Sequence, residues 1–117
     1  MLYKVKKMER VLVGFVDDFD DSVPESVEIN DKLILVVKID DKFYAVDAIC
    51  THQEVELTDG KILRFEGKCP QIVCPAHLGR FDLCTGKAVY KPPKKPLNTY
   101  EVEINDNQVF IVILDSD

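Results

Sequence analysis

Two short segments, Cys50-Thr51-His52 and Cys74-Pro75-Ala76-His77, decide how this 117-residue sequence is interpreted. Each segment supplies one thiolate and one imidazole, a pair of ligand types that suits iron–sulfur clusters, zinc and copper. A zinc finger usually places two cysteines in one segment and two histidines in the other. Here each segment carries one of each, with 21 residues between His52 and Cys74. This order suits a two-iron centre in which one iron takes both thiolates and the other takes both imidazoles.

The placement of the histidines supports a metal site. The sequence contains only two histidines and four cysteines, and each histidine follows a cysteine by two or three residues. Scattered thiols and ordinary histidines rarely produce this pattern by chance. The main alternative for the same four residues is a structural zinc ion, which would make the protein a zinc-stabilised β interaction module.

Composition restricts the class of protein. At 117 residues we expect one domain, residues 1–117, with an ordinary globular share of hydrophobic residues, 46%. The net charge of −6 argues against non-specific nucleic-acid binding, which needs a basic surface. Met1 to Arg10 is charged and has no apolar core of a signal peptide, and the longest apolar runs are far shorter than a membrane span. We therefore expect a cytoplasmic protein without a membrane partner, whose cysteines are metal ligands before they are disulfides.

Short β-branched and alternating segments separated by turns predict an all-β fold. Turn signals occur at Asn30-Asp31, Asp40-Asp41 and Asn105-Asp106-Asn107, and Leu57 to Gly60 suggests one helical turn ended by glycine. Many short strands with close turns favour a sandwich or a partly open barrel. The expected strands are Tyr3–Lys7, Val11–Val16, Val27–Ile29, Lys32–Ile39 as a central strand, Lys42–Val46, Lys61–Phe65, Gln71–Cys74, Arg80–Leu83, Tyr100–Ile104 and Gln108–Leu114.

The two ligand segments, followed by Arg80-Phe81-Asp82 and Thr85-Gly86, resemble Rieske [2Fe–2S] proteins, most closely the small soluble Rieske-type ferredoxins. The resemblance covers about residues 13–114. It implies the Rieske fold, stacked antiparallel sheets with a cluster-binding subdomain at the tip, formed here by loops at about 47–60 and 74–86. It also implies one [2Fe–2S] cluster, with Cys50 and Cys74 on the buried iron and His52 and His77 on the outer iron.

The resemblance implies a function in electron transfer. The protein would be a one-electron carrier and not an enzyme by itself, taking electrons from a flavin- or ferredoxin-linked reductase and passing them to a terminal oxygenase or another redox partner. We expect a monomer. The alternative with the same cluster is a small permanent subunit of a nitrite-reductase-like or arsenite-oxidase-like oxidoreductase.

Departures from the high-potential members of the family indicate the subtype. Their loop-bridging disulfide would lie at Val55 and Ala76, and their sulfur-binding Ser and Tyr at Gly79 and Phe81. Val55 and Ala76 cannot form a disulfide, and Gly79 and Phe81 have no hydroxyl group to donate to sulfur. Hydrogen bonds to sulfur stabilise the reduced cluster, so their loss predicts a potential toward the low end of the range of about −150 to +300 mV.

Three further features of the second loop and its surroundings carry expectations. Leu78-Gly79 stands where the family usually has glycine directly after the second histidine, which predicts a local backbone difference with ligation retained. Cys69 and Cys84 would approach each other across a hairpin; a disulfide is possible, but we favour two free thiols. Asp82 and Thr85-Gly86 are expected to form the turn behind the loop.

Basic residues near the prolines are candidates for docking to a redox partner, with a solvated loop as the alternative: Lys87, Lys91, Lys94 and Lys95.

Overall fold

The computed structural model describes residues 8–91 and 93–114, and the expected strand Tyr3–Lys7 lies outside them. Within these residues the chain forms ten strands and two short 3-10 helices, η1 (Val16–Asp18) and η2 (Leu57–Asp59). The strands are β1 (Met8–Phe15), β2 (Glu25–Ile29), β3 (Lys32–Ile39), β4 (Lys42–Asp47), β5 (Ile62–Leu63), β6 (Gln71–Val73), β7 (Arg80–Asp82), β8 (Ala88–Tyr90), β9 (Thr99–Asn105) and β10 (Gln108–Leu114).

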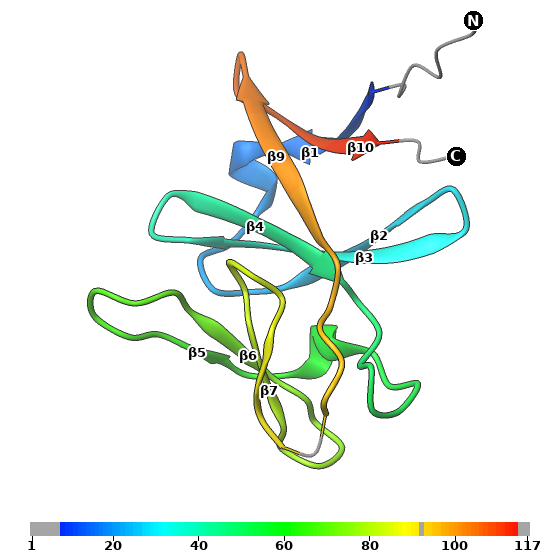
Figure 1. Ribbon diagram of the computed structural model, residues 1–117. Helices are drawn as coiled ribbons and strands as arrows, with labels where there is room; N and C mark the ends of the chain where they lie inside the picture. The colour runs from blue at the N-terminus through cyan, green and yellow to red at the C-terminus, as the bar shows by residue number, and fades with distance from the viewer. Residues whose placement is uncertain (1–7, 92, 115–117) are drawn as a thin grey trace, which may run out of the picture.

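The strands form two antiparallel sheets. The larger has the order β1-β10-β9-β4-β3-β2, and the smaller has the order β5-β6-β7-β8. Figure 1 shows the smaller sheet below β3 and β4, with β1 and β10 at the opposite, upper end. The expected all-β fold of stacked antiparallel sheets is confirmed.

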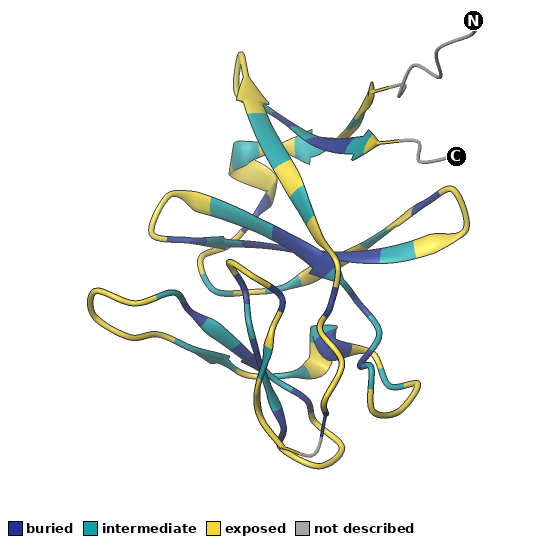
Figure 2. Cartoon of the chain, viewed as in Figure 1, coloured by how far each residue is buried: buried dark blue, intermediate teal, exposed yellow. Residues whose placement is uncertain are grey.

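Strand β3 has an apolar run, Leu33 to Val37, whose side chains are buried on both faces of the strand. Side chains alternate between the two faces of a strand. Ile34 and Val36 enter one core with Val109 and Ile111 of β10. Leu35 and Val37 enter a second core, between the sheets, which is completed by the smaller sheet and the ligand loops. Figure 2 shows the buried segments where the two sheets face each other.

Three tight hairpin turns occur where the sequence predicted turns. The residue pairs Asn30-Asp31, Asp40-Asp41 and Asp106-Asn107 have φ values of +50° to +65°. Positive φ at both central residues is the mark of a type I′ turn, whose twist matches that of the flanking strands, and Asn and Asp tolerate it well. These turns fix the register of β2–β3, β3–β4 and β9–β10.

Some element predictions differ from the structure. Lys61–Phe65 was expected as a strand, but only Ile62–Leu63 pairs with β6. Strand β8 was not predicted, and it pairs with β7 through an irregular register at Arg80/Phe81. The helical turn predicted at Leu57 is present as η2, and Gly60 ends it as predicted.

Candidate metal centre

The first ligand loop follows β4, and backbone hydrogen bonds join its two ends. The backbone N–H of Leu57 donates to the carbonyl of Ala48 at 2.7 Å, and that of Cys50 donates to the carbonyl of Val55 at 3.0 Å. Cys50 points into the core between the sheets and is 4% exposed, whereas His52, two residues on, is exposed. The loop therefore presents its thiol inward and its imidazole outward.

The second ligand loop is the tip of the β6–β7 hairpin. The backbone N–H of Cys74 donates to the carbonyl of Gly79 at 2.7 Å, and that of Leu78 donates to the carbonyl of Cys74 at 2.9 Å. Cys74 is 2% exposed and His77 is exposed. The inward thiol and outward imidazole of the first loop are thus repeated.

The two loops lie at the end of the molecule opposite β1 and β10, in the lower part of the view in Figure 1. The imidazole rings of His52 and His77 lie with their centroids 5.3 Å apart and nearly perpendicular. The thiols of Cys50 and Cys74 both lie in the buried core between the sheets. The structure therefore joins all four predicted site residues, with two buried sulfurs behind two exposed rings.

Burial raises the pKa of the Cys74 thiol, because it disfavours the thiolate. The backbone at Ala76 and His77 acts in the opposite direction and lowers this pKa. At Gly79 and Phe81 the loop lacks the hydroxyl side chains of high-potential relatives. The Phe81 side chain, at one of those hydroxyl positions, is fully buried in the core.

The spread of the four donor atoms bears on which metal they fit. A tetrahedral zinc site has bonds of about 2.0–2.3 Å, which hold its four donors within roughly 4 Å of one another. Among the described residues, three donors within 4.8 Å of one another occur only at Cys69, Asp82 and Cys84. No three donors of the Cys50/His52/Cys74/His77 set meet this limit. The wider spacing, with sulfurs inside and nitrogens outside, suits a two-iron cluster better than one zinc ion.

Leu78, where the sequence predicted a local backbone difference from the family, has a positive φ. Its φ is +63°, in the left-handed region that glycine adopts without cost. Its side chain is 66% exposed beside His77. The loop keeps a glycine-like backbone although a leucine occupies the position.

The preference for free thiols at Cys69 and Cys84 is wrong. The two residues form a disulfide, with Cα atoms 6.0 Å apart, whereas Cys50 and Cys74 are free. They lie just beyond the paired ends of β6 and β7, where the N–H of Leu83 donates to the carbonyl of Pro70 at 3.0 Å. The hairpin that suggested their approach is therefore the reason for the bond.

The turn after β7 is built as predicted. One carboxylate oxygen of Asp82 accepts hydrogen bonds from the backbone N–H groups of Cys84, at 2.7 Å, and Thr85, at 3.0 Å. Gly86 follows with a φ of +78°, and its carbonyl accepts a bond from the N–H of Leu97 at 2.7 Å. This contact brings the chain after Pro93 back to the smaller sheet.

Two positioning residues were missed in the sequence. The Thr51 hydroxyl donates to the carbonyl of Lys95 at 2.7 Å. This bond joins the first ligand loop to the basic segment, the part of the chain that carries Lys87, Lys91, Lys94 and Lys95. Asp47, at the start of that loop, accepts the Tyr100 hydroxyl at 2.7 Å and the N–H of Asn98 at 2.9 Å. The sequence could not predict either set of contacts, because the residues that they join lie more than 40 positions apart. All four candidate docking lysines are exposed.

Comparison with known proteins assigns the family. A model of the Rieske [2Fe–2S] domain matches residues 9–101. The chain belongs to the Rieske [2Fe–2S] family. A Ralstonia protein, the ferredoxin component of naphthalene 1,2-dioxygenase/salicylate 5-hydroxylase systems, is 38% identical over 82% of this chain and 88% of its own length. The naphthalene 1,2-dioxygenase ferredoxin component of Pseudomonas putida is also 38% identical, over 73% of this chain and 77% of its own.

Solved structures of Rieske proteins share the fold. The ferredoxin of carbazole 1,9a-dioxygenase from Nocardioides aromaticivorans superposes with a TM-score of 0.80 and 29% identity, covering 87% of this chain and 95% of its own. A ferredoxin solved in complex with the oxygenase of carbazole 1,9a-dioxygenase gives 0.75 and 29%, covering 86% and 99%. A nitrite reductase small subunit from Mycobacterium tuberculosis gives 0.82 at 13% identity over 97% and 100%, which shows the shared fold alone.

As a Rieske protein related to ferredoxin components, the chain is an electron carrier with one [2Fe–2S] cluster and not itself a catalyst. The convergent pair of buried thiols and pair of exposed imidazoles fits that cluster. Among the described residues, no helix has the length and apolar character needed to cross a bilayer.

Proposed function

We propose that Cys50 and Cys74 hold the inner iron of the cluster, and that His52 and His77 hold the outer iron. The observation that carries this assignment is the convergence of the two loops, with thiols at 4% and 2% exposure behind two exposed imidazoles whose centroids are 5.3 Å apart. The proposed cluster domain comprises residues 1–117, with cluster loops at about 47–60 and 74–86.

The bound cluster supplies a one-electron couple. The protein residues determine how an electron reaches it and at what potential. The exposed rings of His52 and His77 provide the short path to a partner, while the core packed around Cys50 and Cys74 excludes water from the sulfur side. Neutral imidazoles in place of two thiolates raise the potential above that of all-cysteine clusters, about −400 mV.

The second loop and the strand after it support a potential near the low end of the Rieske range. Gly79 and Phe81 supply no hydroxyl hydrogen bond. A low-potential couple suits a carrier in an oxygenase system and not an oxidant of quinols.

The proposed partners are a flavin- or ferredoxin-linked reductase, which supplies the electron, and a terminal oxygenase, which receives it. The relatives named as ferredoxin components of dioxygenase systems support this pairing, as does the ferredoxin solved in complex with an oxygenase. We place this carrier in the cytoplasm, as a monomer. The basic segment fastened to the first loop by Thr51 is the proposed docking element.

Substitution of single ligands tests the assignment. Cys50→Ser, His52→Ala, Cys74→Ser and His77→Ala should each yield protein with little or no iron and acid-labile sulfide after reconstitution. Gln53→Ala, an exposed neighbour in the same loop, should keep two irons and two sulfides as the matched control. A full cluster in any of the four ligand variants would overturn the assignment of that residue.

A further inference from the structure

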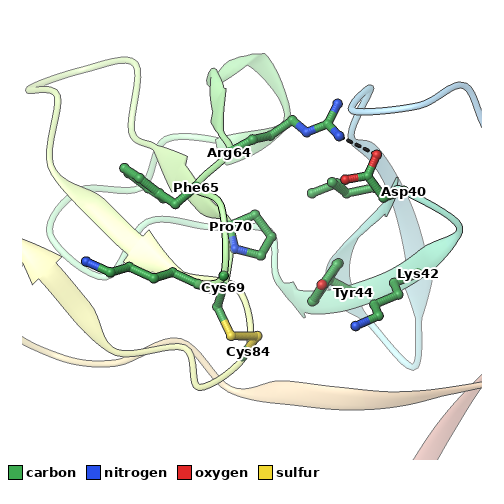
Figure 3. Close-up of a pocket in the computed structure, with 11 residues that line it drawn as sticks. Asp40, Lys42, Tyr44, Arg64, Phe65, Cys69, Pro70 and Cys84 are labelled. Atoms are coloured by element: carbon green, nitrogen blue, oxygen red, sulfur yellow. Dashed lines mark hydrogen bonds and ion pairs between the residues drawn. A yellow bond between two sulfur atoms is a disulfide. The ribbon is translucent and has the colours of Figure 1, made fainter.

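A pocket of about 500 Å³ lies between the two sheets, away from the ligand loops. Figure 3 shows Lys42 and Tyr44 of β4 on one side and Arg64, Phe65 and Pro70 of the β5–β6 connection on the other. The Cys69–Cys84 disulfide forms part of the same wall. The ion pair between Arg64 and Asp40 spans the opening from one sheet to the other.

The disulfide closes the base of the hairpin that carries half of the metal centre. Cys69 precedes β6 and Cys84 follows β7, at a sequence separation of 15. Cys74 and His77 both lie within this closed loop. The three-residue strands β6 and β7 are short, so the covalent bond is a large part of what holds the hairpin together.

The pocket is basic although the protein is acidic overall, with a net charge of −6. Among the described residues, Lys42 and Lys68 make no ion pair, whereas Arg64 is paired with Asp40 and Asp21. Asp40 is the one carboxylate in the pocket wall. Asp82 lies within 4.8 Å of both sulfurs but does not line the pocket. An anion therefore meets attraction on the pocket side of the disulfide and repulsion on the Asp82 side.

We propose that this pocket is a thiol-exchange site that accepts a small anionic thiol, such as an acidic peptide thiol. Its thiolate attacks Sγ of Cys84, which is exposed, and Sγ of the half-buried Cys69 leaves as a thiolate. A second equivalent of the thiol attacks the resulting mixed disulfide. This yields two protein thiolates, which take up protons from water, and one molecule of the oxidised thiol. Two electrons pass from the small thiol to the protein disulfide.

Exchange would release the base of the β6–β7 hairpin and loosen the hold of Cys74 and His77 on the cluster. The site would thereby link cluster retention to the thiol pool around the protein. In a reducing compartment, lasting structural disulfides are rare and those that form are usually transient or redox-sensing. The effect on the cluster rests on the proposed ligand assignment, whereas thiol exchange at the disulfide does not depend on it or on which partner receives the electron.

Thiol counting tests the disulfide and the attacked sulfur without any electron-transfer assay. The cluster-loaded protein is denatured in acid, freed of sulfide and alkylated without reductant; two alkylated cysteines are expected, and four would overturn the proposal. Cys69→Ser, treated with oxidised glutathione, should gain one glutathionyl group at Cys84. Cys84→Ser should gain it at Cys69 several-fold more slowly. Equal or reversed rates would contradict attack at Cys84.

Charge reversal tests the pocket. In Lys42→Glu/Lys68→Glu, glutathione should open the disulfide about five- to tenfold more slowly at low ionic strength, with a smaller change for neutral 2-mercaptoethanol. Lys32→Glu/Lys61→Glu carries the same change in net charge outside the pocket and should behave as the unaltered protein. Equal slowing in both double variants would overturn a role for the pocket.

Cluster retention tests the consequence. Opening the disulfide with glutathione should shorten the half-life of iron release to a chelator several-fold. Cys69→Ser/Cys84→Ser should show the short half-life from the start and no response to glutathione. An unchanged half-life after complete opening would refute the link between the disulfide and the metal centre.

Discussion

Gly60 lies directly against the carbonyl oxygen of Val73, and a Cβ atom at position 60 would overlap that oxygen. Gly60 ends the first ligand loop, and Val73 immediately precedes the Cys74 of the second. The backbone N–H of Val73 also donates to the carbonyl of Lys61 at 2.9 Å. The approach of the two loops is therefore set at this contact, next to the proposed ligand Cys74.

Gly60→Ala should destabilise the protein by about 1–3 kcal/mol, because the added methyl group would overlap the backbone carbonyl of Val73, which cannot rotate away as a side chain can. The φ of Gly60, −81°, is ordinary for alanine, so the effect would be steric. Urea unfolding of the cluster-free protein measures it. Gly67→Asn is the control, because a Cβ there has open space and asparagine tolerates its φ of +72°. Equal stability of the Gly60→Ala variant would contradict the close approach.

Leu78→Gly should leave stability unchanged or raise it by roughly 1 kcal/mol. The left-handed φ of +63° costs leucine about 1–2 kcal/mol, part of which the greater chain entropy of glycine cancels. The exposed leucine side chain contributes little burial. Thermal unfolding monitored by circular dichroism provides the comparison, and Leu78→Ala, which keeps the backbone cost, should show no gain. A loss of more than 1 kcal/mol in the glycine variant would show that the leucine side chain stabilises the loop.

Tyr100 should make the protein sensitive to alkali. Burial first, and then the nearby Asp47 carboxylate that accepts its hydroxyl, raise the pKa of Tyr100 above its ordinary value. A phenol in the unfolded chain ionises near pH 10, so the stabilisation is complete below about pH 10 and is lost as the pH rises beyond it.

Urea unfolding at pH 8 to 11 measures this loss of stability, and Tyr100→Phe should show a smaller loss above pH 10 than the unaltered protein. Tyr90→Phe, at an exposed position, is the matched control. If the Tyr100→Phe and unaltered proteins lost stability in parallel, the ionisation of Tyr100 would not be the cause.

Lys94→Glu/Lys95→Glu should slow electron transfer to an anionic acceptor. Ferricyanide imitates an acidic partner surface, and its rate of oxidising the reduced protein should fall on the order of tenfold at low ionic strength, with the difference shrinking in salt. Stopped-flow absorbance measures the rate. Lys32→Glu/Lys61→Glu matches the change in charge away from the basic segment. A rate equal to that of this control would leave Lys94 and Lys95 as a solvated loop.

Local chemistry made much of the fold predictable. The Asn and Asp pairs at 30–31, 40–41 and 106–107 determine three hairpins through their tolerance of positive φ. The run Lys32–Ile39 indicated a central strand, and the structure places its apolar residues in two cores. Strand β8 escaped prediction because three residues before a proline segment carry no readable period.

The pairs Cys50/His52 and Cys74/His77 were proposed as ligands from their spacing, since each pair lies within four residues, and the structure brings the four side chains to one end of the fold. Contacts that depend on tertiary structure could not be predicted in this way. The hydrogen bond from Thr51 to Lys95 and the ion pair from Arg64 to Asp40 join residues far apart in sequence with no local signal. The hairpin indicated that Cys69 and Cys84 could approach each other, but the expected cytoplasmic location favoured free thiols. The structure has the disulfide that the hairpin geometry allows.

The most direct test of the central claim is the visible absorption and low-temperature EPR spectrum of the purified protein before and after dithionite, with iron–sulfur reconstitution if it is isolated without metal. The account predicts a red-brown protein that bleaches on reduction. Its rhombic EPR signal should have an average g below the free-electron value, the mark of a cluster with mixed histidine and cysteine ligands. A colourless, EPR-silent protein with stoichiometric zinc would contradict the account and leave a structural module on the Rieske fold.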